Sequence, residues 1–91
     1  MHEITVERNV TPIKLETLAV DLWPVWTKEV STFDWHYEQN ETCYILEGEA
    51  TITPKNGTAV SVAEGDLVNF SQGLSCQWDI TVAITKHYLL K

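Results

Sequence analysis

Alternating apolar and polar residues dominate the middle of the chain and predict β-strands, because successive side chains of a strand point to opposite faces. One alternating run covers residues 43–52, a second covers 58–62, and a third covers 67–70. All three lie within residues 41–70, and nothing in that stretch has the period of a helix. The pattern therefore predicts a β-meander.

Two turns separate these runs. Asn56-Gly57 lies between the first two, and this dipeptide is a strong hairpin signal because both of its residues tolerate positive φ. Gly65, between Glu64 and Asp66, predicts a second tight turn in which the glycine has positive φ. We therefore expect a hairpin closed by Asn56-Gly57 and a further turn at Gly65.

The residues before the meander predict two strands, or one bent strand, over 28–30 and 33–37. On the second of these, the two-residue period places Phe33, Trp35 and Tyr37 on one face. We expect this aromatic face to point into the protein interior.

The residues after the meander predict a return strand over 75–79 and a closing strand over 81–90. Cys76 and Trp78 share a face of the return strand. If Cys76 faces inward, Trp78 does too.

Two spaced motifs make the chain resemble the cupin superfamily. Glu41 is followed after six residues by Gly48, and Gly65 is followed after five residues by Ser71 and then by Gly73, with Ser71 standing where the superfamily prefers proline. Further segments resemble small single-domain cupins related to ureidoglycine aminohydrolase: Trp23-Pro24-Val25-Trp26, residues 40–48, residues 64–68 and Lys86-His87-Tyr88. The resemblance implies an all-β, single-domain cupin fold, a double-stranded β-helix or jelly-roll barrel. It is a poor guide to activity, because one fold hosts many chemistries.

The length of 91 residues, 44% of them hydrophobic, fits one domain over residues 1–91. We expect an N-terminal arm over about 1–19, with one turn of helix starting at Pro12, and a barrel over about 20–91. His2 is expected to be disordered. So small a core has limited stability, which favours a homodimer.

Charge and composition limit the kinds of partner that we expect for this protein. The net charge of −7 disfavours nucleic acid and anionic membranes as partners. The chain has no apolar run of membrane-spanning length and no signal-peptide pattern at its start, so we expect a cytoplasmic protein. Cys43 and Cys76 are then expected to be free thiols rather than a disulfide.

The resemblance also raises the question of a metal site. Metal-binding cupins supply two histidines of an H-x-H motif and a glutamate from the first motif, and a third histidine from the second. In one register this chain has Trp35 and Tyr37 at the first two histidine positions, Glu41 at the glutamate and Cys76 at the last histidine. An indole nitrogen cannot ligate a metal through a ring lone pair.

The other register places Asp34 and His36 at the H-x-H positions and does not restore the histidines either. We therefore expect no metal and no other cofactor. The alternative is zinc, iron, manganese or nickel bound by Glu41 and Cys76 together with His36 or His87.

Glu41 faces inward if the cupin alignment holds, and a buried carboxylate needs a partner or a proton. The candidate partners are Tyr37, the indoles of Trp35 and Trp78, and Lys86 or His87. Two interpretations stay open. Glu41 is either a catalytic acid or base whose pKa burial raises, or a structural carboxylate bonded to its neighbours.

A nucleophilic Cys76, or a redox pair with Cys43, is the less favoured interpretation, because an acidic and aromatic pocket keeps thiols protonated.

Three functions follow as hypotheses. The favoured one is a barrel that binds a small cationic or amide-bearing molecule. The residues expected to line that pocket are Trp35, Tyr37, Glu41, Cys43, Phe70, Cys76, Trp78 and His87. The second is a hydrolase or isomerase of nitrogen or ureide metabolism that uses Glu41, with or without a metal. The third is a dimeric interaction module with an exposed Trp23 and Trp26 patch.

Overall fold

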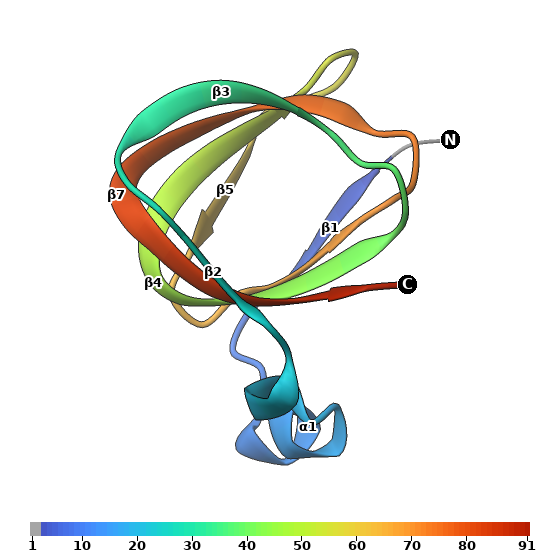
Figure 1. Ribbon diagram of the computed structural model, residues 1–91, viewed down its shortest axis with the longest axis vertical. Helices are drawn as coiled ribbons and strands as arrows, with labels where there is room; N and C mark the ends of the chain where they lie inside the picture. The colour runs from blue at the N-terminus through green and yellow to red at the C-terminus, as the bar shows by residue number, and fades with distance from the viewer. Residues whose placement is uncertain (1–2) are drawn as a thin grey trace.

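Strands make up most of the computed structural model, which describes residues 3–91 (Figure 1). The strands are β1 (Ile4–Glu7), β2 (Val25–Lys28), β3 (Ser31–His36), β4 (Glu41–Pro54), β5 (Val60–Ala63), β6 (Leu67–Phe70) and β7 (Ser75–Leu90). Helix α1 (Pro12–Thr17) and the 3₁₀ helix η1 (Val20–Leu22) follow β1. The predicted all-β barrel is confirmed, whereas the expectation for His2 concerns a residue outside those described.

The two long strands organise the sheet. Neighbours pair in the order β1-β6-β4-β7-β2, all antiparallel, with β3 also on β7 and β5 also on β4. Strands β4 and β7 have 14 and 16 residues and pair along most of their length. The strands curve around a common interior, and the segment holding α1 and η1 projects beyond one end of it (Figure 1).

The N-terminal segment contributes to this sheet. Strand β1 pairs with β6, with Ile4 opposite Phe70 and Glu7 opposite Leu67. Strand β1 thus lies within the stretch expected to be an N-terminal arm, where the alternation of Ile4 and Val6 already suggests a short strand. The helical turn predicted at Pro12 is present, and the Thr11 hydroxyl accepts a hydrogen bond from the Lys14 amide at 3.2 Å, as an N-cap does.

The hairpin of β4 and β5 is confirmed, but the turn chemistry predicted for it is wrong. Neither Asn56 nor Gly57 has positive φ, and the Gly57 amide donates to the Pro54 carbonyl at 3.2 Å. Strand β4 runs on to Pro54 because it also pairs with β7, so the hairpin connection is longer than two residues. The positive φ predicted for Gly65 is confirmed at 91°.

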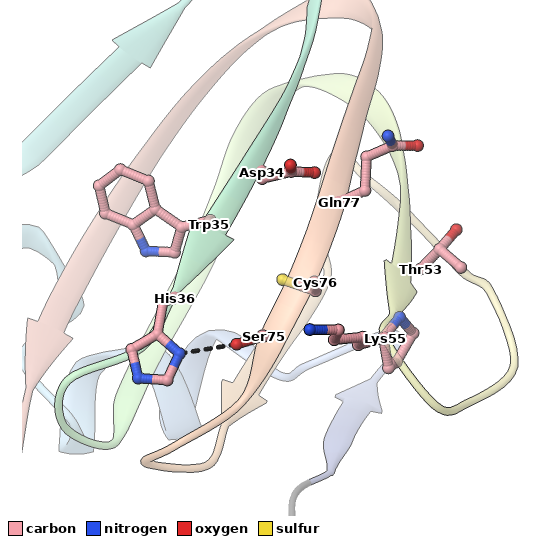
Figure 2. A pocket seen from close by; sticks show the side chains of 9 residues that line it. Asp34, Trp35, His36, Thr53, Lys55, Ser75, Cys76 and Gln77 are labelled. Atoms are coloured by element: carbon pink, nitrogen blue, oxygen red, sulfur yellow. Dashed lines mark hydrogen bonds between the residues drawn. The ribbon is translucent and has the colours of Figure 1, made fainter.

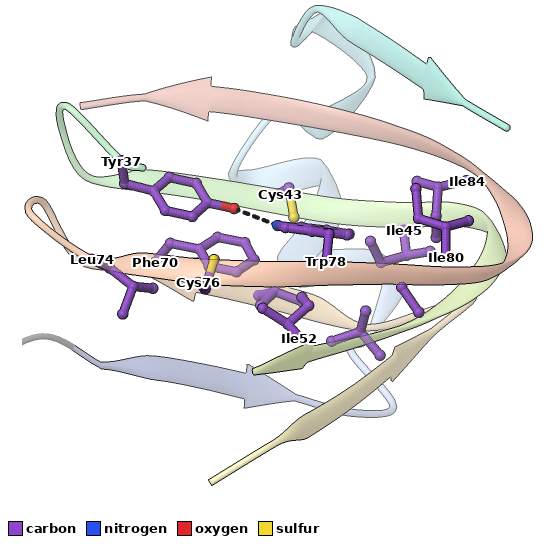
Figure 3. Close-up of a cluster of buried hydrophobic side chains, with 13 residues drawn as sticks. Tyr37, Cys43, Ile45, Ile52, Phe70, Leu74, Cys76, Trp78, Ile80 and Ile84 are labelled. Atoms are coloured by element: carbon purple, nitrogen blue, oxygen red, sulfur yellow. Dashed lines mark hydrogen bonds between the residues drawn. The ribbon is translucent and has the colours of Figure 1, made fainter. Parts of the chain in front are cut away.

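Two apolar clusters hold the chain together. The first fills the barrel with thirteen buried residues, among them Ile45, Ile52 and Trp78 (Figure 3). The second packs Val20 and Trp23 against Leu67. Because Trp23 is buried there, it does not belong to an exposed interaction patch.

Candidate functional site

An open pocket of about 270 Å³ lies on the inner side of β2, β3 and β7. Its lining residues are Trp26, Phe33, Trp35, Tyr37, Glu41, Trp78, Lys86, Tyr88 and Leu90. Strand register brings them together from distant parts of the chain, since Trp26 lies opposite Lys86 and Phe33 lies opposite Trp78. The lining is largely aromatic, with one carboxylate and one ammonium group.

Glu41 and Lys86 form an ion pair in this pocket. The Lys86 Nζ donates to Glu41 Oε2 at 2.8 Å, and the two side chains are only 7% and 9% exposed. Of the partners considered for Glu41 from the sequence, the structure selects Lys86. A buried carboxylate and a buried ammonium each need such a partner, because removing either charge from water is costly.

The ammonium of Lys86 also lies against aromatic faces. Its Nζ is 4.9 Å from the ring centroids of both Trp26 and Trp78, and 5.9 Å from that of Phe70. These distances are within the range of cation–π attraction. The protein's own lysine therefore occupies the place where an aromatic pocket would hold an external cation.

Tyr37 forms one wall beside this pair. Its ring stacks on Phe70 with centroids 4.5 Å apart, and its hydroxyl accepts a hydrogen bond from the Trp78 indole at 3.2 Å (Figure 3). Burial, and next the charge of Glu41, raise the pKa of Tyr37 far above its usual range. The phenol therefore stays neutral and serves as a hydrogen-bonding group.

The two cysteines are free thiols, as predicted. Burial raises the pKa of Cys43 to about 12 and that of Cys76 to about 11, although the charge of Lys86 acts in the opposite direction. Both thiols stay protonated near neutral pH, which argues against a nucleophilic cysteine.

Cys76 lines a different hollow, which is shown in Figure 2. That hollow measures about 570 Å³, and there His36 Nδ1 lies 2.7 Å from the Ser75 hydroxyl. Trp35, at 47% exposure, lines both this hollow and the aromatic pocket. The two cavities are therefore neighbours separated by one indole.

The structure brings together four of the eight residues that the sequence suggested for a pocket: Trp35, Tyr37, Glu41 and Trp78. Phe70 lies beneath Tyr37, and Cys43 is fully buried in the core. His87 does not reach the pocket, because its neighbour Lys86 faces inward and adjacent strand residues face opposite ways. Its Nδ1 instead lies 2.9 Å from the Trp23 carbonyl oxygen.

Five lining residues were absent from the predicted set: Trp26, Phe33, Lys86, Tyr88 and Leu90. The signal for four of them was available in the sequence. Phe33 shares a strand face with Trp35 and Tyr37. Trp78, Lys86, Tyr88 and Leu90 are separated by even intervals on one strand, so an inward Trp78 implies the others.

The residues considered as an alternative metal set are dispersed. Glu41 pairs with Lys86, and Cys76 lines the neighbouring hollow. His36 is hydrogen-bonded to the Ser75 hydroxyl, and His87 to the Trp23 carbonyl. Within residues 3–91, no three histidine, cysteine, aspartate or glutamate side chains are grouped closely enough to hold an ion.

The antiparallel barrel and its inward-facing pocket define a cupin. The chain belongs to the EutQ-like cupin family, because the family model described as a EutQ-like cupin domain matches residues 15–88. No curated protein matches it significantly.

Solved structures support this assignment. A DUF861 family protein from Thermotoga maritima is 48% identical, with 98% of this chain and 100% of that chain covered and a TM-score of 0.95. A DUF861 family protein from Pseudomonas syringae pv. tomato is 26% identical over 74% of this chain and 29% of that one, with a TM-score of 0.66. The EutQ protein of Clostridium difficile shares the fold, at 21% identity over 97% of this chain and 67% of that one, with a TM-score of 0.65.

In the part of the chain that the structure describes, no helix has the length and apolar character needed to cross a membrane.

Proposed function

We propose that this cupin binds a small, uncharged organic molecule in the aromatic pocket. The observation that carries the proposal is the Glu41–Lys86 pair in the lining of that pocket. A buried ion pair is often no more stabilising than apolar residues of similar size, so packing alone is a weak reason to have one there. Apolar walls with a few convergent polar groups are typical of ligand sites.

The ion pair supports a narrower class of ligand than the cationic or amide-bearing molecules expected from the sequence. A free cation is disfavoured, because the Lys86 ammonium already lies over the rings of Trp26 and Trp78. A neutral molecule with a carbonyl or amide group fits better, since its oxygen can accept from Lys86 and an N–H can donate to Glu41. An apolar cavity of about 150 Å³ holds benzene, so a pocket of about 270 Å³ suits a single ring with one polar substituent.

A fragment screen followed by thermal unfolding tests this proposal. We expect neutral carbonyl and amide fragments to raise Tm, because a ligand that binds only the folded state stabilises it. The pocket variant is Trp35→Leu, which changes a half-exposed wall, and the control is Leu22→Ala, at an 80% exposed residue outside the pocket. The shift should persist in the control and shrink in Trp35→Leu. The absence of any binding fragment, or equal shifts in both variants, would refute the proposal.

The ureidoglycine aminohydrolase resemblance supports a second candidate, a hydrolase or isomerase with Glu41 as acid or base. The hydrogen bond between Glu41 and Lys86 favours this enzyme, because a proton can pass between the two groups. Elemental analysis of native protein and of Glu41→Gln tests the metal-dependent form. Stoichiometric zinc, iron, manganese or nickel, lost in the variant, would make this enzyme the better proposal.

We also infer a homodimer from the small core, and no nucleic acid or anionic membrane as a partner from the net charge of −7. The cytoplasmic location stays a prediction. Light scattering after size exclusion tests the oligomeric state. A mass equal to one chain at micromolar concentration would contradict the dimer.

A further inference from the structure

We propose that Lys86 forms a reversible imine with a small aldehyde or ketone in the aromatic pocket, with Glu41 as the group that accepts and returns the proton. This inference rests on the proposed binding function and names the chemistry of the ligand. It makes Lys86 a site of covalent capture rather than a structural residue.

Lys86 stands apart from the other lysines of the chain. It is the buried lysine of the described residues, and it lines a pocket large enough for a ligand. Lys14, in contrast, is 44% exposed and pairs with Glu7 at the surface. Lysines desolvated in apolar pockets are the ones that serve as amine nucleophiles toward carbonyl compounds.

Glu41 supplies the proton transfer that the reaction needs. Its Oε2 lies 2.8 Å from the Lys86 Nζ, within direct transfer distance. The ammonium gives one proton to Glu41, and the free amine attacks the carbonyl carbon as the C=O π bond opens. A proton then passes from the nitrogen to the new alkoxide oxygen, which gives a neutral carbinolamine. Glu41 then returns its proton to the carbinolamine hydroxyl, which leaves as water while the C=N bond forms. The net change is ammonium plus carbonyl compound to iminium plus water, with the Glu41 carboxylate regenerated and no oxidant or reductant consumed.

The product keeps the electrostatic contacts of the starting state. The iminium carries the same single positive charge as the ammonium, beside the same carboxylate and against the indoles of Trp26 and Trp78. Cation–π attraction and the ion pair therefore stabilise it. A surface lysine offers no such environment, so its imine is exposed to hydrolysis. The pocket should select Lys86 over the other lysines for this reason.

Tyr37 and Cys43 do not compete for the carbonyl compound. Burial raises the pKa of Tyr37 and of Cys43, so both stay protonated near neutral pH. Lys86, in contrast, has the Glu41 carboxylate within hydrogen-bonding distance as a base.

Reductive trapping tests the proposal directly. The protein is incubated with benzaldehyde and, separately, with cyclopentanone at neutral pH, and sodium cyanoborohydride is added to convert an imine into a stable amine. Intact mass and peptide mapping then locate the adduct. We expect one adduct, on Lys86, with labelling at least about ten times faster than on Lys14, in keeping with the contribution of a positioned acid or base.

Three variants sharpen the result. Lys86→Arg keeps a cation beside Glu41 but cannot form an imine, so the adduct should disappear. Glu41→Gln keeps a hydrogen-bond acceptor but not a base, so labelling of Lys86 should slow by about tenfold or more. Lys14→Arg is the matched control and should label as the native protein does. Thermal unfolding of each variant verifies that it folds.

Binding of benzyl alcohol separates this proposal from the proposed function. Benzyl alcohol has the size of benzaldehyde but no carbonyl, and its binding is followed by quenching of tryptophan fluorescence. If it binds and Lys86 labels no faster than Lys14, imine formation is refuted and the binding function stands. If neither benzyl alcohol nor benzaldehyde binds, imine formation is refuted, and the fragment screen decides the binding function. Equal labelling of native protein and Glu41→Gln would refute the role of Glu41.

Discussion

Replacing Lys86 with methionine should cost far more stability than the loss of one surface ion pair. The variant leaves the Glu41 carboxylate buried at 9% exposure with no cation beside it. Unit charges 2.8 Å apart attract by about 6 kcal/mol at an effective dielectric constant of about 20. The cost of dehydrating both groups offsets part of that attraction, and breaking buried pairs costs about 3–5 kcal/mol in practice. That loss is a large share of the roughly 5–15 kcal/mol that holds a domain folded.

The measurement is the free energy of unfolding in urea, followed by tryptophan fluorescence, for a double-mutant cycle. Lys86→Met should lose about 3–5 kcal/mol, whereas Lys86→Met combined with Glu41→Gln should recover most of it, because no buried charge remains. Lys14→Met is the control. It breaks the pair with Glu7, at 2.6 Å but with both side chains nearly half exposed, and should cost no more than about 1 kcal/mol.

Two outcomes would refute this reasoning. If Lys86→Met costs no more than Lys14→Met, the carboxylate reaches water or another partner and the pair is not a buried one. If the double variant is as unstable as the sum of the single ones, the loss comes from packing rather than from an unpaired charge.

Two further predictions concern backbone and thiols. Gly65→Ala should cost about 1–2 kcal/mol for its positive φ alone, because nothing lies within 4 Å of the added Cβ. Gly48→Ala should cost at least about 2 kcal/mol more than Gly65→Ala in urea unfolding, because its Cβ would also collide with the Ala83 carbonyl oxygen. Equal losses in the two variants would contradict this close approach. In the folded chain burial raises the pKa of Cys43 to about 12 and that of Cys76 to about 11, whereas the ordinary thiol pKa is 9.0. The unfolded state therefore binds fewer protons than the folded state above pH 9. The free energy of unfolding should therefore fall as pH rises above 9, by up to about 1.4 kcal/mol per pH unit and thiol, and a slope unchanged in the double alanine variant would contradict this.

The strands of the meander were predicted well because sheet periodicity is local. The strand expected over 28–30 was misplaced, since β2 ends at Lys28, and the two strands expected over 75–79 and 81–90 are the single strand β7. The runs at 43–52 and 67–70 became parts of β4 and all of β6. The turn at Asn56-Gly57 failed for a non-local reason. Pro54 is held opposite Cys76 of β7, which lengthens β4 and takes the dipeptide out of the tight-turn positions.

The pocket was harder to predict, because its composition depends on which strands meet. Trp26 reaches the site through its pairing opposite Lys86, a contact between strands far apart in the sequence. Lys86 was considered as a partner of Glu41 but was not among the residues expected to line the pocket, and a lysine that is buried has such a specific partner. The choice between Lys86 and His87 could nevertheless have been made from the even spacing that links Lys86 to Trp78.

One irregularity in β4 connects the barrel to the site. Glu41 and Ile45 point inward at odd positions, whereas Ile52 points inward at an even one, so the strand changes phase between them. The register with β7 shifts in that interval, which forms a β-bulge around Gly48. Gly48 has a φ of 102° and lies close to the backbone of β7, and only glycine tolerates both. Without the shift, a strand that buries Ile52 in the core would turn Glu41 outward, because a one-residue change of phase reverses every side chain. The ion pair with Lys86 therefore depends on the bulge as much as on the two charged residues.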